Sequence, residues 1–308
     1  QFARFLDSGA IDIDFGPGQS GVTPSLGYSY NDFTLTPDGK IVTVQRRYNG
    51  NIADRYDVIV RQYLASGTLD PTFGAAGVFV FNDGGYSAYA VQVAVQQNQI
   101  LVGGYLERLS PSPTSPGSFQ TDSRDVFLFR LSADGQALDQ DFGASGQVLY
   151  RHYAAQNNQY DTFYTMGVDS GGGVVVSGSY GQYRFSASGQ FDGDFGTSGL
   201  SSRSISPNSG SGFAFGDDGK IYLVGSSYNG PEGANFAVQR WNSDGTSDDS
   251  FNGGVEEGTY VQTAFTGPLS DQFRRVTVRQ ADGKVLVVGQ SSGGGTEVVL
   301  TRYLADGT

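Results

Sequence analysis

Hydrophobic and polar residues alternate along most of the chain in short runs separated by glycine-containing turns. Residues 30–36 alternate up to Pro37-Asp38-Gly39, and the alternation resumes at once in residues 40–48. An Asp-Gly pair between two such runs is typical of a β-hairpin, because glycine accepts the positive φ that tight hairpin turns require. The same hairpin is predicted at Asp218-Gly219-Lys220 and Asp282-Gly283-Lys284, and Gln97-Asn98-Gln99 and Ser170-Gly171-Gly172 take its place elsewhere.

The strand after each hairpin turn is the most apolar of its group. It reads ILVGGY at 100–105, VVVSGS at 174–179, IYLVGSS at 221–227 and VLVVGQS at 285–291. A continuous apolar run predicts a strand that is covered on both faces. A third strand is predicted at 56–64, 125–131, 181–185, 235–241 and 296–304, and a fourth at 77–82, 146–153, 199–205 and 259–265. No segment has a helical period, so we expect an all-β fold.

The turn after the third strand repeats through the whole chain. It reads FLDSGAIDIDFG at 5–16, YLASGTLDPTFG at 63–74 and RLSADGQALDQDFG at 130–143, and its glycines are Gly9, Gly67, Gly135, Gly189, Gly245 and Gly307. An internal period of about sixty residues indicates units that must stack on their neighbours to bury an apolar face. Four short antiparallel strands in each unit predict a five-bladed β-propeller of four-stranded antiparallel blades.

The two ends of the chain suggest how the ring closes. The sequence opens with a third strand at 1–6 and a fourth strand at 21–26, and its last repeat lacks a fourth strand. We therefore expect the N-terminal strand 21–26 to complete the last blade, which leaves 1–6 as a spare strand. Residues 1–308 are expected to form a single β-propeller domain, excised from a longer chain, with repeats at about 10–67, 68–135, 136–189, 190–245 and 246–307.

Composition and net charge exclude several classes of binding partner and binding site. The 308 residues include 19 basic and 31 acidic side chains, a net charge of −12, which argues against nucleic acid and an anionic membrane surface as partners. Cysteine is absent, so disulfides and thiolate metal sites are excluded. No apolar run approaches the roughly 20 residues of a membrane helix, so no membrane insertion is expected.

The order of motifs resembles a known repeat family. A V-x-V strand is followed by DGKI, a strand ending in V-x-G, a strand ending in R-Y-x-x-D-G, and then L-D-x-x-F-G-x-x-G. This order is similar to the delta-60 repeat, found in tandem in bacterial proteins, over nearly the whole chain. The second and third repeats lack DGK, the third strand of the third repeat is short, and one turn ends in Phe251-Asn252. The resemblance implies a repeat architecture and an exported bacterial protein, extracellular, on the cell surface or periplasmic, and transfers no catalytic residues.

Paired aspartates occur near the Phe-Gly turn. Carboxylates two residues apart in a glycine-rich loop could bind calcium, which takes six to eight oxygen ligands. The alternative, which the sequence favours, is that they cap turn N–H groups and pair with a repeated arginine, so no cofactor is expected. The pairs are Asp12 and Asp14, Asp139 and Asp141, Asp192 and Asp194, and Asp248 and Asp249; the arginines are Arg4, Arg130, Arg184, Arg240 and Arg302, with Arg61 displaced by one.

The other candidate functional residues have little support from the sequence. His152 is the only histidine, and no partner motif surrounds it, so an incidental role is favoured over a general base. The glycine-rich runs do not open helices, which disfavours phosphate binding. Phe15, Phe73, Phe142, Phe195 and Phe251 recur at one turn position and are expected to be core anchors between blades.

The variable loops indicate where a site could lie. In a propeller, the turns between first and second strands and between third and fourth strands share one face, and the remaining connections share the other. Binding sites concentrate on variable loops of a rigid scaffold, which here are 49–55, 107–123, 228–234 and 291–296 within repeats and 83–87, 154–162, 207–211 and 267–272 between them.

Tyrosines gather at the strand ends beside these loops. A tyrosine offers an apolar face and a polar tip, which suits sugars and protein surfaces. We therefore expect ligand binding by Tyr48, Tyr86, Tyr105, Tyr153, Tyr160, Tyr180 and Tyr228, with simple coverage of the blade ends as the alternative. No catalytic or metal-binding residues are assigned.

These features favour a non-catalytic, exported propeller that binds a protein or glycan surface, or has a structural role, through its variable loops. One alternative is a lectin-like carbohydrate binder. Another is a glycoside hydrolase with paired carboxylates in a central channel. The hydrolase is disfavoured because no predicted inner strand carries an acidic residue that its counterparts lack.

Overall fold

The computed structural model describes residues 2–18, 20–23, 31–50, 56–112, 114–115, 119–152, 160–201, 212–228, 234–251, 260–263, 271–279, 282–291 and 297–308. Within these ranges all regular structure is β-strand, so the all-β prediction is confirmed. Among the same residues there is no helix with the length and apolarity to span a bilayer.

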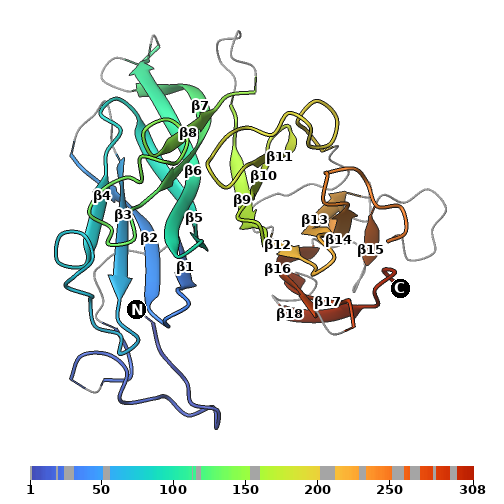
Figure 1. Cartoon of the computed structure of the whole chain (residues 1–308), viewed down its shortest axis with the longest axis horizontal. Coiled ribbons are helices and arrows are strands. Elements are labelled where there is room, and N and C mark those ends of the chain that lie inside the picture. Colours follow the sequence, from blue (N-terminus) through green and yellow to red (C-terminus); the bar gives the residue numbers. More distant parts are fainter. Residues whose placement is uncertain are drawn as a thin grey trace. The chain divides into compact units, whose positions relative to one another are not determined.

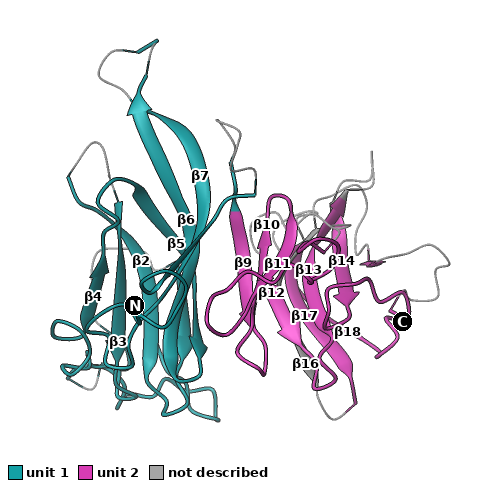
Figure 2. Ribbon diagram, turned by 45° about the horizontal axis from the view of Figure 1, so that its top comes forward, with its two compact units in different colours: residues 1–162 teal, residues 163–308 magenta. Residues whose placement is uncertain are grey.

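The chain divides into two compact units, residues 1–162 and 163–308 (Figures 1 and 2). Unit 1 holds two four-stranded antiparallel sheets with strands in chain order. The first sheet consists of β1 (Asp32–Leu35), β2 (Ile41–Tyr48), β3 (Tyr56–Tyr63) and β4 (Val78–Phe81). The second consists of β5 (Ser87–Gln96), β6 (Gln99–Pro111), β7 (Phe119–Arg130) and β8 (Gln147–Tyr150).

Unit 2 holds three sheets of the same antiparallel kind. The third sheet of the chain has β9 (Phe163–Val168), β10 (Val174–Gly178) and β11 (Gly181–Phe185). The fourth has β12 (Gly212–Phe215), β13 (Ile221–Tyr228), β14 (Ala234–Trp241) and β15 (Val261–Thr263). The fifth has β16 (Asp271–Arg279), β17 (Lys284–Ser291) and β18 (Glu297–Tyr303). The predicted repeat of small antiparallel sheets is therefore present in both units.

The hairpin turns lie where the sequence predicts them. In the first sheet, Leu35 lies opposite Ile41 across a turn in which Gly39 has a φ of 80°. In the second sheet, Gln97 and Asn98 both take positive φ, 49° and 67°. Two consecutive positive φ values are the signature of a type I′ hairpin turn. The local turn chemistry thus sets the register of the first two strands in each sheet.

The second strand of the sheets carries the core. All five residues of β10 and the first five of β2 are buried, which confirms that these apolar runs are covered on both faces. In unit 1 the largest cluster joins the first and second sheets, and Phe81 stacks on Phe129 with 4.6 Å between ring centroids. Burial of each large apolar side chain contributes on the order of 2 kcal/mol, so contact between adjacent sheets is a major source of stability.

The predicted loop 107–123 is wrong for most of its length. β6 continues to Pro111 and β7 begins at Phe119, and these two residues face each other in the ladder. The Ser and Pro residues there suggested a loop, but at the outer end of a two-stranded ribbon they need no buried partner. Figure 2 shows the two strands extending together beyond their sheet.

The N-terminal segment departs from the expected closure. Ala3 is bridged to Val22, so the segment expected to be spare pairs with the one expected to complete the last blade. The fifth sheet contains three strands among the described residues. Residues 24–26 of the expected donor strand lie outside the described residues. In the third sheet, Ser201 is bridged to Gln182, and 202–205 of the predicted fourth strand are also outside them.

Candidate functional site

The paired aspartates form structural corners with the repeated arginine. In the second sheet, Arg130 Nε donates to Asp139 Oδ2 at 2.7 Å, and its guanidinium lies 4.8 Å from the centre of the Phe142 ring. Asp139 Oδ1 accepts the backbone N–H of Asp141. Burial would raise the pKa of Asp139, but these hydrogen bonds and the guanidinium hold it below its usual value. The pairing recurs as Arg4 with Asp12, Arg184 with Asp192 and Arg240 with Asp248.

Three of these arginines also bind the turn of the following repeat. Arg4, Arg184 and Arg240 donate from Nη1 to the backbone carbonyls of Ala65, Ser243 and Ala305 at 2.7, 2.6 and 2.6 Å. The first aspartate of each pair is therefore occupied by a guanidinium that has a structural task. Within the described part of the chain, no three His, Cys, Asp or Glu side chains are grouped to hold a metal. Calcium at these corners would have to displace the arginine.

Three of the seven tyrosines proposed from the sequence come together in unit 1. Tyr48 is the last residue of β2, Tyr105 lies in the middle of β6, and Tyr160 is bridged to Arg124 of β7. Tyr86 is half-buried and interacts electrostatically with Arg151, and Tyr180 follows β10 in unit 2. Tyr153 and the side chain of Tyr228 are outside the described residues.

A row of four tyrosine rings in contact forms the base of this site. Tyr48 contacts Tyr56 with 5.8 Å between centroids, Tyr56 contacts Tyr89 at 5.2 Å, and Tyr89 stacks on Tyr105 at 4.9 Å with an interplanar angle of 14°. Tyr48 lies opposite Tyr56 in the β2–β3 ladder, and Tyr89 lies opposite Tyr105 in the β5–β6 ladder. Cross-strand register therefore makes two of the three contacts, and the packing of the first sheet on the second makes the third.

Two guanidinium groups lie over the rings. Arg46 is 5.1 Å from the centroid of Tyr56 and 5.4 Å from that of Tyr89. Arg124 is 4.9 Å from Tyr105 and 5.8 Å from Tyr160. These are cation–π distances. We name the whole group the tyrosine–arginine cluster; it comprises Arg46, Tyr48, Tyr56, Tyr89, Tyr105, Glu107, Arg124 and Tyr160.

Glu107 is the single carboxylate of the cluster. It is buried and accepts two hydrogen bonds of 2.7 Å from Arg124. The Tyr89 hydroxyl also hydrogen-bonds to Glu107, and burial together with this carboxylate raises the pKa of Tyr89. Burial raises the pKa of Tyr105 as well, with Arg124 acting in the opposite direction. Both phenols are consequently protonated at neutral pH.

The cation of Arg46 is available to an anion. Its side chain is exposed, and among the described residues no carboxylate forms an ion pair with it. An exposed guanidinium beside flat phenol rings can bind a planar carboxylate while the rings cover an apolar face of the same ligand. The sequence pointed to Tyr48, Tyr105 and Tyr160 but missed Tyr56, Tyr89 and both arginines, which only the strand register brings into contact.

A second polar group lies near β7 and β8. Asp125 forms an ion pair with Arg151, and Asp161 accepts the backbone N–H of His152 at 2.8 Å. Asp161 is buried, one of its oxygens has no hydrogen-bond partner, and burial raises its pKa. The His152 ring lies 3.2 Å from the Tyr150 hydroxyl through Nδ1. The Asp125–Arg151 ion pair connects the end of β8 to the middle of β7.

Sequence comparison supports a propeller-type repeat family. The model of DUF5122, a domain of unknown function described as a β-propeller, matches residues 36–73, 217–251 and 280–308. Each matched segment contains or adjoins one of the Asp-Gly-Lys hairpin turns. No curated protein matches the chain in sequence.

Three solved structures to which the chain is similar are of enzymes. A polysaccharide lyase, Uly1, shares 16% identity at a TM-score of 0.50, over 89% of this chain and 57% of the lyase. A puromycin hydrolase shares 14% at a TM-score of 0.45, over 88% of this chain and 35% of the hydrolase. An α-L-arabinanase of Penicillium chrysogenum shares 11% at 0.39, over 89% and 92%. At these identities the likeness shows the fold alone.

The expectation of a non-catalytic module is therefore corrected. A solved protein of similar fold, the polysaccharide lyase, is an enzyme, so the fold gives no reason to prefer a non-catalytic role. As catalytic groups, the sequence reasoning considered only His152 and paired carboxylates. It did not consider chemistry carried by tyrosine and arginine, which the cluster in unit 1 contains.

Proposed function

We propose that this chain is an enzyme that cleaves a uronate-containing polysaccharide by β-elimination at the tyrosine–arginine cluster. The observation that carries the proposal is the placement of Tyr89, whose hydroxyl hydrogen-bonds to Glu107 and whose ring lies under the Arg46 guanidinium. A proton-transfer group and a carboxylate-binding cation thus meet on one aromatic surface.

The tyrosine rings and the exposed guanidinium of the cluster would each recognise a different part of a uronate sugar. Pyranose rings present apolar C–H faces that pack on tyrosine, and the uronate carboxylate is a planar partner for an exposed guanidinium. The net charge of −12 opposes long-range attraction of an anionic polymer. Binding therefore depends on the local contacts of Arg46 and the tyrosines rather than on electrostatic steering.

The reaction can be written with its protons balanced. When Arg46 neutralises the uronate carboxylate, the proton on C5 becomes more acidic. Tyr89 takes that proton as it passes its own to Glu107, a double bond forms between C4 and C5, and the C4–O4 bond breaks. Glu107 then returns its proton to Tyr89, which protonates the departing oxygen, so both groups end in their starting states.

The number of carboxylates favours elimination over hydrolysis. Glycoside hydrolysis by the usual route requires two carboxyl groups about 5 to 10 Å apart across the bond. Glu107 is the only carboxylate of the cluster, and it is buried beneath Arg124. A solved protein of similar fold is a polysaccharide lyase, which supports the compatibility of the fold with this reaction.

The test is digestion of soluble polyuronates, including polygalacturonate, alginate and glucuronate-containing polymers. Elimination gives an unsaturated product that absorbs in the ultraviolet, whereas hydrolysis gives reducing ends without that absorbance. We expect Tyr89→Phe to lower kcat by 100-fold or more, since proton transfer contributes about 10² to 10⁴, and Arg46→Gln to raise KM.

Tyr303→Phe is the matched control. Tyr303 is a buried tyrosine of unit 2 whose hydroxyl bonds to Thr263 at 2.7 Å, so its loss tests only the removal of a phenolic oxygen. Full activity of Tyr89→Phe, or reducing ends without ultraviolet absorbance, would contradict the proposed reaction. Absence of cleavage for every polyuronate would exclude the substrate class.

We also infer the finer architecture from the repeats. The chain is a delta-60 repeat protein, exported to the bacterial surface or periplasm, in which five blades close into a ring through strand 21–26. The fifth sheet supports this because β18 leaves Val298 and Leu300 exposed at 81% and 66%. Hydrogen exchange tests it: slow exchange of the outward-facing β18 amides is expected, and exchange at the rate of an unpaired edge would exclude closure at this strand.

A further inference from the structure

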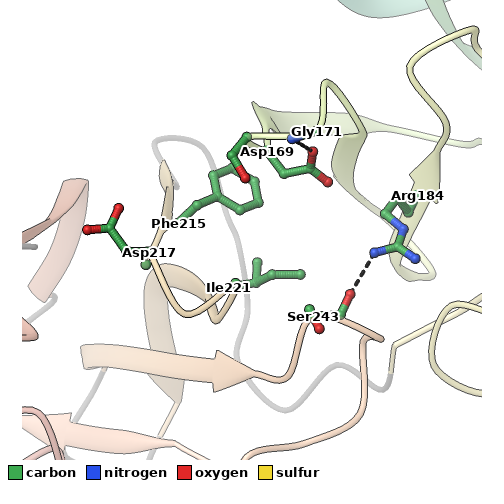
Figure 3. Close-up of a pocket in the computed structure, with 10 residues that line it drawn as sticks. Asp169, Gly171, Arg184, Phe215, Asp217, Ile221 and Ser243 are labelled. Atoms are coloured by element: carbon green, nitrogen blue, oxygen red, sulfur yellow. Dashed lines mark hydrogen bonds between the residues drawn. The ribbon is translucent and has the colours of Figure 1, made fainter.

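Unit 2 contains a cavity of about 430 Å³ between the third and fourth sheets. One wall is the hairpin turn of the third sheet, with Asp169, Ser170 and Gly171, and the opposite wall is the turn of the fourth sheet around Asp217. Arg184, Phe215, Ile221 and Ser243 complete the lining (Figure 3). The volume lies within the usual range of small-molecule sites, about 300 to 1,000 Å³.

The cavity between the third and fourth sheets is open because one residue of the third sheet differs from its counterparts in three other sheets. The residue after the hairpin turn is Lys40 in the first sheet, Gln99 in the second and Lys220 in the fourth. Each of these side chains reaches the aspartate of its own corner, Asp70, Asp139 and Asp248 respectively, at 2.8, 2.6 and 2.8 Å. The third sheet has Gly173 at this position, so no side chain covers its corner.

The absence of a side chain at Gly173 leaves the arginine of the third sheet more exposed than its counterparts. The Arg184 side chain is 27% exposed, whereas Arg130 and Arg240 in the filled corners are 7% and 8% exposed. Arg184 uses Nε and Nη2 on Asp192 and Nη1 on the Ser243 carbonyl. A guanidinium carries five N–H donors, so Arg184 retains donors for a further acceptor.

The opposite wall supplies an acceptor. Asp169 Oδ1 accepts the backbone N–H groups of Gly171 and Gly173 at 2.9 and 2.7 Å, which fixes the carboxylate and leaves Oδ2 without a hydrogen bond among the described residues. Figure 3 shows Phe215 beside Asp169 and Arg184 beside Ser243. The lining thus combines a fixed acceptor, fixed donors and an aromatic ring.

We propose that this cavity is a saccharide site that binds one neutral sugar unit. Adjacent sugar hydroxyls take one acceptor and one donor each, and the apolar face of the ring packs on Phe215. Asp192 already compensates the charge of Arg184, so the Asp169 carboxylate disfavours the binding of uronates and other anions. Binding here does not depend on the reaction proposed for unit 1.

Titration of the full chain with D-glucose, D-galactose, D-xylose and L-arabinose, followed by NMR, tests the site. We expect at least one of these sugars to bind saturably, and Asp169→Asn to weaken its binding tenfold or more. The asparagine keeps Oδ1 as the acceptor for the turn but replaces the carboxylate oxygen that faces the sugar. An unchanged melting temperature would show that the turn survives.

Asp218→Asn is the matched control because Asp218 accepts the N–H of Lys220 in the adjacent turn and does not line the cavity. The Asp218→Asn variant is expected to bind the sugar with the same affinity as the unsubstituted chain. The proposal fails if none of the four sugars binds at millimolar concentration, or if binding survives Asp169→Asn and is lost in Arg46→Gln. Loss of polyuronate cleavage in Tyr89→Phe with sugar binding intact would separate the two sites.

Discussion

The ring of Phe73 lies directly against Gly135, the turn glycine of the following repeat. A Cβ added to Gly135 would lie 2.1 Å from Phe73 Cε2, and Gly135 has a φ of +66°. Phe15 lies against Gly67 and Phe195 against Gly245 in the same way. The turn phenylalanine of one repeat therefore packs on the turn glycine of the next. We call this contact the Phe–Gly joint, and it requires two successive repeats.

Gly135→Ala is expected to destabilise the protein by about 3 kcal/mol or more. The added methyl group would overlap a buried ring that cannot move, and the positive φ adds strain. The measurement is urea unfolding. Gly9→Ala is the control, since Gly9 has a φ of +82° and nothing within 4 Å of its added Cβ. It should show only the backbone cost, about 1 kcal/mol; equal losses would mean that the joint contributes nothing.

Asp248→Asn is expected to cost about 3 kcal/mol at pH 7, because it leaves the buried Arg240 guanidinium without its charge partner. Burial would raise the pKa of Asp248, but Lys220, Ser250 and Arg240 hold it well below 3.8. A lowered pKa in the folded state stabilises above the unfolded value and loses its effect as pH falls through the folded value. The difference from the unsubstituted chain should be constant from about pH 5 upward and shrink below about pH 4; a constant difference at all pH values would contradict it.

Asp161→Asn is expected to raise the stability of the protein at pH 7, whereas Asp248→Asn is expected to lower it. Burial raises the pKa of Asp161 above 3.8, so its ionised form destabilises the fold above the folded pKa and has no such effect below 3.8. Asparagine keeps an acceptor for the His152 N–H and removes the buried charge. Thermal unfolding should show a gain in stability at pH 7 that vanishes in acid. A loss of stability at pH 7 would mean that the electrostatic attraction of Asp161 to His152 and Arg151 outweighs the burial cost.

The double substitution Asp169→Thr with Gly173→Lys should rebuild the first-sheet turn in the third sheet. Thr36 and Lys40 occupy these places in the first sheet, and Thr36 Oγ1 accepts the Lys40 N–H at 2.9 Å. The new lysine would reach Asp192 and cover Arg184. We expect sugar binding to be abolished and stability to rise by about 0.5 to 1 kcal/mol. Gly173→Lys alone should gain less, because its Cβ would meet Asp169 Oδ2 at 2.4 Å.

The sequence predicted the local structure better than the sites. Asp-Gly turns, apolar second strands and the Arg–Asp–Phe corners depend on residues close in the chain or repeated with a fixed period, so the pattern indicates them. The tyrosine–arginine cluster depends on the register between Tyr89 and Tyr105 and on contact between two sheets. The cavity depends on the missing side chain at Gly173, which a search for chemically active residues passes over.

The arginine ties that run from Arg4, Arg184 and Arg240 to the next turn all point in the same direction along the chain. Each tie involves only a segment and its immediate successor, so a whole period can be duplicated or deleted without remaking any other tie. The ties themselves therefore set no limit on the number of repeats, which closure of the ring would have to set. A repeat without a lysine at this position, such as the one that contains Gly173, can offer a binding site of its own while its neighbours keep the scaffold intact.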